Sequence, residues 1–184
     1  MTTSRWPDHL LGLEEWHALP EDTSRRFELV EGVLSVAPRP SPRHQRLAGL
    51  LARAVDDALP DGWCALNEVE IVVEAGTTPT VRVPDVVVLR ADAVDDRPRV
   101  TPADVLAVAE VLSPGTHRTD RVTKLAEYAE AEIPRYAIVD DGPPLTLTTF
   151  VLGDRRSRQE VVHHGRAVVD LGFPVPLDMT TWSR

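Results

Sequence analysis

The sequence has too little of several residue types to belong to certain protein classes. Its single cysteine, Cys64, excludes an internal disulfide and a thiolate-rich metal site. No apolar run approaches the roughly 20 residues that span a bilayer, and the start, MTTSRWPDHLLGLEEW, lacks a basic stretch followed by an apolar one. We therefore expect a cytoplasmic protein in which Cys64, within WCALNEV, is a buried structural thiol.

Positive charge is also scarce. The formal net charge is −9, and Lys124 is the only lysine. An acidic chain is unusual for a nucleic-acid enzyme, because affinity for phosphates comes mainly from Lys and Arg. The distribution of charge matters more than its sum, however, and a site for a hard metal ion itself needs clustered carboxylates.

What the chain does contain is typical of a globular protein. Hydrophobic residues make up 42% and charged residues 27% of 184 residues, which disfavours disorder. A chain of this length usually forms one hydrophobic core, so we expect a single domain over residues 1–184.

The N-terminal third predicts a short helix, a hairpin and a long helix. Leu13 to Leu19 is amphipathic and is followed by Pro20, and residues 26–36 form two apolar stretches about the turn Glu31-Gly32. Ser41-Pro42 then starts a helix whose apolar positions recur at helical spacing up to Leu59.

The other face of this long helix carries a set of basic residues: Arg43, His44, Arg46 and Arg53. They form the most basic local surface of the chain. This face is either solvated or in contact with phosphate groups, and the spacing alone does not decide between the two.

The rest of the chain predicts mostly strands. The expected strands are Ala65 to Glu74, Thr80 to Leu89, Val105 to Leu112 and Arg135 to Val139, with weaker ones near Leu145 to Leu152, Gln159 to His163 and Ala167 to Asp170. A helix from about Thr119 to Ala131 would make a β-α-β unit, and Pro174 and Pro176 would close the tail. The pattern indicates an α/β (α+β) fold with a mixed central sheet flanked by helices.

Two of these strands contain an unexpected carboxylate. VRVPDVVVL and DVLAVAEVL are nearly continuous apolar runs, the pattern of central strands, yet alternation places Asp85 and Glu110 on core-facing positions. A buried isolated charge is costly, so such groups are paired, protonated or bound to a metal. If the two strands are neighbours, a Mg²⁺ ion between the carboxylates would satisfy both.

A structural role for this pair is the alternative. It would require Arg or Lys partners for Asp85 and Glu110 inside the core. Alternation places the nearby Arg82 on the opposite face from Asp85, so Arg82 is not such a partner.

Lys124 lies on one stripe of the predicted helix with Asp120 and Tyr128, at spacings of i, i+4 and i+8. Its compact ammonium could orient a water molecule or neutralise a phosphate. A helix-surface pair between Asp120 and Lys124, worth a few tenths of a kcal/mol, is the other interpretation.

Four blocks, FELVEG, SPRHQ, VPDVVVL and AEVLSPGTHRTDRVTKLAEYAEAEIPRYAIVD, resemble the Uma-two-type endonuclease family in their order and spacing. This family is a bacterial branch of the PD-(D/E)XK restriction-endonuclease-like superfamily. The resemblance runs from about Leu13 to Asp140.

The resemblance implies a site. Asp85 and Glu110 would be the acidic metal-binding pair, Glu28 an additional acidic residue and Lys124 the catalytic lysine. The superfamily usually places its lysine two residues after the second acid, where this chain has Leu112. If the lysine has moved to the following helix, Lys124 completes the set; if not, the domain binds metal without turnover.

Two further residues, Glu31 and His44, have expected roles. Glu31, beside Gly32, is interpreted as a turn residue. His44 matches the family's histidine after Ser-Pro and is either a capping or solvated residue or, with Arg43 and Arg46, a phosphate contact.

The expected function is therefore hydrolysis of DNA phosphodiesters with Mg²⁺, or Mn²⁺ in its place. We expect a homodimer, because two sites are needed to cut both strands of a duplex. The alternative is a nuclease-like domain that binds nucleic acid or a protein partner without cleaving.

Overall fold

The structure, a computed structural model, describes residues 7–20, 25–37, 39–95, 99–152 and 158–182. Its centre is a six-stranded mixed sheet in the order β10-β9-β8-β7-β6-β3. The bounds of these strands are β3 (Trp63–Leu66), β6 (Val86–Arg90), β7 (Val105–Val111), β8 (Arg135–Asp140), β9 (Thr146–Leu152) and β10 (Arg158–His164). Only β7 and β8 pair in parallel among these six, as the expected β-α-β unit requires.

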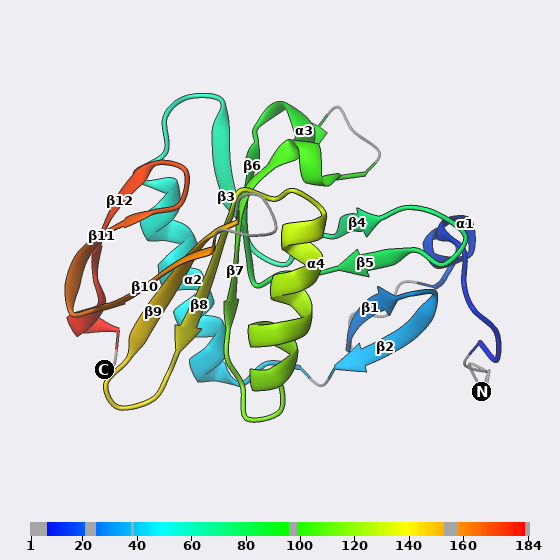
Figure 1. The fold of residues 1–184 in the computed structure, drawn as a ribbon, viewed down its shortest axis with the longest axis horizontal. Coiled ribbons are helices and arrows are strands. Elements are labelled where there is room, and N and C mark those ends of the chain that lie inside the picture. Colours follow the sequence, from blue (N-terminus) through cyan, green and yellow to red (C-terminus); the bar gives the residue numbers. More distant parts are fainter. Residues whose placement is uncertain (1–6, 21–24, 38, 96–98, 153–157, 183–184) are drawn as a thin grey trace.

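A second, antiparallel sheet of four strands lies beside one end of the central sheet, in the order β2-β1-β5-β4 (Figure 1). Its strands are β1 (Arg26–Val30), β2 (Val33–Ala37), β4 (Ile71–Glu74) and β5 (Thr80–Arg82). The expected hairpin is confirmed. Its turn has positive φ at Glu31 (50°) and Gly32 (78°), as a two-residue turn of this kind needs, so the structure confirms Glu31 as a turn residue.

Two expected strands are each divided between the two sheets. Ala65 to Glu74 becomes β3 and β4, and Thr80 to Leu89 becomes β5 and β6. The second break falls at Val83-Pro84-Asp85, where proline has no N–H to give to a central ladder. The expectation that Asp85 lies within a continuous strand is therefore wrong, because Asp85 lies where the chain crosses from one sheet to the other.

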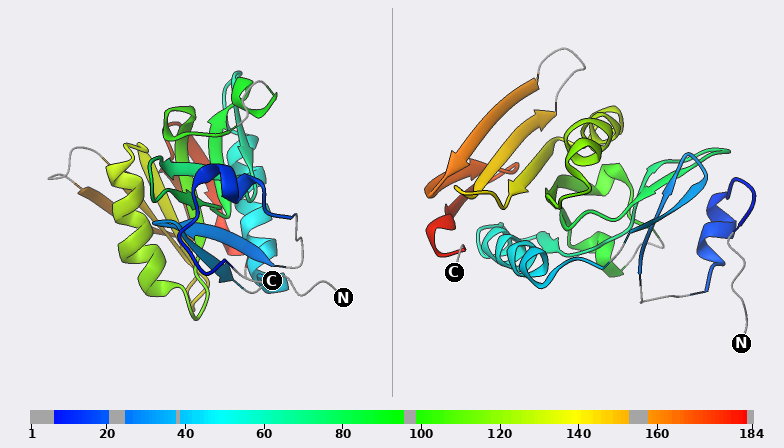
Figure 2. Two further views of the ribbon diagram at one scale, coloured as in Figure 1. Left: turned by 90° about the vertical axis from the view of Figure 1, so that its right-hand side faces the viewer. Right: turned by 90° about the horizontal axis from the view of Figure 1, so that it is seen from below.

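Two helices cover opposite faces of the central sheet, as the two views in Figure 2 show. On one face lies α2 (Pro42–Asp56), which begins where expected: the Ser41 side chain accepts a hydrogen bond from the His44 N–H. It ends three residues before the expected Leu59. On the other face lies α4 (Leu125–Glu130), preceded by a π-helical turn, η2 (Thr119–Lys124).

The remaining elements lie at the edges of the molecule. The β-hairpin of β11 and β12 packs on the face that α2 covers, and β12 was missed because Pro174 and Pro176 suggested an end of structure rather than an edge strand. The other short elements are α1 (Leu13–His17), α3 (Asp92–Asp95), η1 (Pro102–Asp104), β11 (Arg166–Asp170), β12 (Pro174–Asp178) and η3 (Met179–Thr181). None of the helices in the described ranges is long and apolar enough to cross a membrane.

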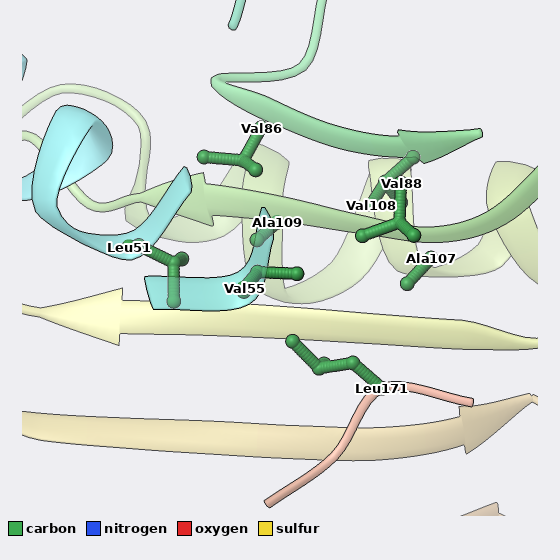
Figure 3. Close-up of a pocket in the computed structure, with 8 residues that line it drawn as sticks. All are labelled: Leu51, Val55, Val86, Val88, Ala107, Val108, Ala109 and Leu171. Atoms are coloured by element: carbon green, nitrogen blue, oxygen red, sulfur yellow. The ribbon is translucent and has the colours of Figure 1, made fainter. Parts of the chain in front are cut away.

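The core between α2 and the central sheet is closely packed. Leu51 and Val55 of α2 meet Val86, Val88, Ala107 and Ala109 of the sheet around a cavity of only about 10 Å³ (Figure 3). A purely apolar space of this size does not hold a ligand. Cys64, expected to be buried, is only half-buried at the margin of the other core, and burial there raises the pKa of its thiol.

This packing predicts the cost of a core truncation. Leu51→Ala removes a side chain that is fully buried and should lower the free energy of unfolding by about 2–5 kcal/mol in urea titrations. Val168→Ala, at a position that is 66% exposed on β11, is the matched control and should change it by less than about 0.5 kcal/mol. Equal effects of the two substitutions would contradict the assignment of this core.

Candidate functional site

Asp85 and Glu110, the two carboxylates that the sequence singles out, lie next to each other. Strands β6 and β7 pair antiparallel, with Val86 opposite Ala109. Asp85, which precedes Val86, therefore lies beside Glu110, which follows Ala109. Both side chains are about 2% exposed. The Val111 N–H donates to Asp85 Oδ2 over 2.7 Å, and this bond fixes the Asp85 carboxylate against β7.

Asp85 is surrounded by donors. Arg26 Nη1 donates to its Oδ1 over 2.5 Å, and His44 Nε2 lies 3.0 Å from its Oδ2. Burial alone would raise the pKa of Asp85, but the hydrogen bond from His44 and the positive charge of Arg26 lower it to about 2. Asp85 is therefore an anion at neutral pH.

Glu110 has a different environment. Its Oε1 accepts from Lys124 Nζ over 2.8 Å and from the Tyr128 hydroxyl over 3.2 Å. Complete burial and the nearby Asp85 charge outweigh the attraction of Lys124, and they raise the pKa of Glu110 to about 7. The two carboxylates thus differ strongly in their affinity for a proton.

Lys124 is buried, with 6% of its surface exposed, so the helix-surface interpretation of Lys124 is wrong. Its Nζ lies within 4 Å of three carboxylates: Glu110, Glu28 at 3.2 Å and Asp120 at 3.7 Å. Burial lowers the pKa of Lys124, but these negative charges raise it above its ordinary value. Lys124 therefore stays an ammonium ion.

The π-helical turn η2 contributes to the placement of Lys124. Asp120 and Lys124 are its two buried residues, and the α-helix that follows adds Tyr128 to the same side. π-turns are rare and occur frequently at functional sites. The stripe of Asp120, Lys124 and Tyr128 expected from helical spacing faces Glu110.

Glu28, on β1, is linked to the charged group of Asp85, Glu110 and Lys124, and the whole set of ion pairs is called the cluster below. A second buried cation, Arg82, also binds Glu28. Arg82 Nη1 donates to Glu28 Oε2 over 2.9 Å and binds Glu127 with two further bonds of 2.7 and 2.6 Å. The Val83 N–H also donates to Glu28. Burial raises the pKa of Glu28, but Lys124 and Arg82 lower it overall. Arg82 thus ties β1 and β5 to α4.

The four basic side chains expected to form one face of the long helix have different environments. The His44 ring points inward to Asp85, Arg43 pairs with Asp141, and Arg46 and Arg53 are exposed. Within the described part of the chain, His44 Nδ1 is buried and has no hydrogen-bond partner.

Three members of the cluster were missed at the sequence level: Arg26, Arg82 and Glu127. Arg26 could have been found, because it lies two residues before Glu28 and so shares its face of the strand. For Arg82, alternation correctly separated it from Asp85 but gave no hint of Glu28, which is far away in sequence. Glu127 lies one position from Tyr128 and looked like a solvated helix residue.

A structural role for the carboxylate pair requires cationic partners in the core, and the structure contains them. Arg26 binds Asp85 and Lys124 binds Glu110. These ion pairs are compatible with a purely structural role for Asp85 and Glu110. It also means that neither carboxylate needs a metal ion for the chain to fold.

The donor set still suits a divalent cation. Five carboxylates, Glu28, Asp85, Glu110, Asp120 and Glu127, lie among three permanent cations, Arg26, Arg82 and Lys124. When all five are ionised and His44 is neutral, two negative charges are in excess. Oxygen ligands with this excess match Mg²⁺ or Mn²⁺. Among the residues described, no three of His, Cys, Asp and Glu form a ready-made metal cage, because cations lie between the acids.

The fold and the buried acidic pair define a restriction-endonuclease-like α/β protein. The Uma2 family model, described as "putative restriction endonuclease", matches residues 13–180, and the chain belongs to this family. The crystal structure of a "putative nuclease belonging to DUF820" from Anabaena variabilis is similar, with a TM-score of 0.73 and 15% identity over 94% of this chain and 97% of that one. None of the curated proteins compared with the chain matches it.

The geometry predicts strong energetic coupling between Lys124 and Glu110. Lys124→Met leaves two buried carboxylates, Glu110 and Asp120, and the partly buried Glu28 without their shared cation, and it should cost about 3–5 kcal/mol in urea unfolding. In a double-mutant cycle with Glu110→Gln, the loss should be partly recovered.

The control for this cycle is the exposed pair Arg166 and Asp178, whose coupling should be far smaller. A Lys124–Glu110 coupling no larger than that of the exposed pair would show that the buried contact is not formed in solution.

Proposed function

We propose that the chain is a metal-dependent DNA endonuclease whose metal ligands are Asp85 and Glu110, with Glu28 as an additional acid. The observation that carries this proposal is the proximity of two buried carboxylates, Asp85 just before β6 and Glu110 in the neighbouring β7, with an ammonium group, Lys124, bound to Glu110. Membership of a family described as restriction endonucleases supports the same activity.

A divalent cation held by Asp85 and Glu110 would lower the pKa of a bound water and polarise the phosphodiester. The residues of the chain supply the rest. Lys124 stays protonated beside three carboxylates, so it does not act as a base. Its role is to orient the attacking water or to balance negative charge as the phosphorane-like transition state forms.

Several neighbours position these groups. Tyr128 donates to Glu110, and Arg82 holds Glu28 toward Lys124. His44 and the Val111 N–H hold the Asp85 carboxylate. His44 Nδ1, which has no partner within the described residues, is available for a water molecule or a phosphate oxygen. Arg43 and Arg46 lie in the first two turns of the same helix and would contact the DNA backbone.

A domain that binds nucleic acid or a protein partner without cleaving is the second candidate. The protein-supplied cations on both carboxylates favour it, because the cluster is satisfied as it stands. Leu112 at the usual lysine position favours it too. Metal binding alone does not separate the two candidates, whereas turnover does.

Turnover is tested by nicking of supercoiled plasmid in Mg²⁺ or Mn²⁺. Asp85→Asn, Glu110→Gln and Lys124→Met should each lower the nicking rate by at least about 100-fold, since each removes a charge from the reacting centre. Glu160→Gln, at an exposed position on β10, is the matched control and should nick like wild type. Equal rates in all five proteins would rule out this site.

Removal of the metal provides an independent check. Wild-type protein treated with EDTA should lose nicking activity and should recover it when Mg²⁺ or Mn²⁺ is added back in excess. Its thermal unfolding midpoint in EDTA should stay above the assay temperature, because the protein's own cations pair with the carboxylates. Nicking that persists in EDTA would contradict a metal-dependent reaction.

A homodimer remains part of the proposal. Cleavage of both strands by chains with one site each is most simply done by a two-fold pair. Sedimentation of the purified protein, with and without duplex DNA, measures this directly.

A further inference from the structure

Arg26 occupies the position between the two carboxylates that are proposed to bind metal. Its Nη1 donates to Asp85 Oδ1, and its Nη2 lies 3.8 Å from Glu110 Oε2. The guanidinium therefore supplies, from the protein itself, a positive charge at the position a metal ion would take. Its side chain is 15% exposed, so Arg26 lies at the solvent side of a pair that is only 2–3% exposed.

The contacts of Arg26 are incomplete. Within the described residues, Nη2 is buried and has no hydrogen-bond partner, although a guanidinium has five N–H donors in a planar fork. Such a fork matches the two oxygens of a carboxylate or a phosphate. A buried donor without an acceptor is costly, and here it is directed into the site.

A divalent cation and Arg26 cannot both satisfy Asp85 and Glu110 from the same side. Like charges at close range in a buried site repel each other strongly. Glu28, whose charge also acts on Arg26, is already bound by Arg82, Lys124 and the Val83 N–H. An Arg26 side chain displaced by metal would therefore be left without an anion from the protein.

We propose that Arg26 exchanges partners during the reaction cycle: a divalent cation displaces it from Asp85 and Glu110, and the freed guanidinium then binds the phosphodiester of DNA. This inference rests on the proposed function, because it needs both the metal and the substrate. The phosphodiester is the anion that the reaction itself brings to the site. Arg26 is thus a substrate-binding residue that becomes available only in the metal-loaded protein.

The first test measures metal binding without DNA. Mn²⁺ is titrated at constant ionic strength into wild type, Arg26→Met and the control Arg166→Met, which replaces an exposed arginine paired with Asp178. Free Mn²⁺ is followed by EPR. Arg26→Met should bind Mn²⁺ about tenfold more tightly or better than the other two, because the competing cation is gone. Equal or weaker binding by Arg26→Met overturns the proposal.

The second test measures DNA binding, with a fluorescein-labelled duplex followed by anisotropy. In EDTA, Arg26→Met and Arg166→Met should bind the duplex equally, because Arg26 is held by the carboxylates. In saturating Ca²⁺, which takes the same oxygen ligands, Arg26→Met should bind about tenfold more weakly than Arg166→Met. A loss of the same size in both conditions would indicate a merely structural arginine and overturns the proposal.

A second variant of Arg26 and the Mn²⁺ affinities together separate a failure of this inference from a failure of the metal site. Arg26→Gln, which keeps a hydrogen-bond donor but not the charge, replaces Arg26→Met if circular dichroism shows that the latter is unfolded, and the same results are expected from it. If wild type and both Arg26 variants bind no Mn²⁺ at millimolar concentration, the proposed metal site itself is wrong, and this inference fails with it. If all bind equally and wild type nicks plasmid, only the exchange is wrong.

Discussion

The buried charge of Asp85 is the constraint on which the rest of the site depends. An anion inside the protein must be neutralised locally, and Arg26, His44 and the Val111 N–H do so from three separate elements. The same donors keep the carboxylate ionised, which is the state that a metal ion requires. A second cation, Lys124, performs the corresponding role at Glu110. The site is thus a network of opposite charges in which three cations, Arg26, Arg82 and Lys124, are shared among five acids.

Much of the fold follows from the sequence, and the exceptions have physical causes. The hairpin, the start of α2, strand β7 and the β-α-β unit agree with the patterns of apolar residues. The prediction of one strand through Asp85 is wrong, because the apolar pattern continues across Pro84 while the chain passes from one sheet to the other there. Period-two patterns record burial, and they do not record which sheet buries the residue.

The residues of the site also divide into those that the sequence predicts and those that it does not. Asp85 and Glu110 could be predicted because each is a charge in an apolar run, and the resemblance to a family added Glu28 and Lys124. Alternation places Arg26 on the same strand face as Glu28 but does not reveal its partner Asp85, 59 residues away, and Arg82 could not be assigned from sequence, since its partners lie 45 and 54 residues away. An arginine in a strand looks the same whether it faces solvent or a buried acid. Only the docking of the two sheets decides which of these it does.

The crossing at Val83-Pro84-Asp85 has a consequence for the order of folding. Site residues come from β1, α2, β5, the crossing, β7, η2 and α4, so both sheets must form and dock before the acids and their cations meet. Contacts between such distant segments form late, because the loops between them must first be closed. A partly folded or newly made chain therefore carries no assembled acidic centre. Any activity of this site therefore requires the finished fold, with both sheets docked.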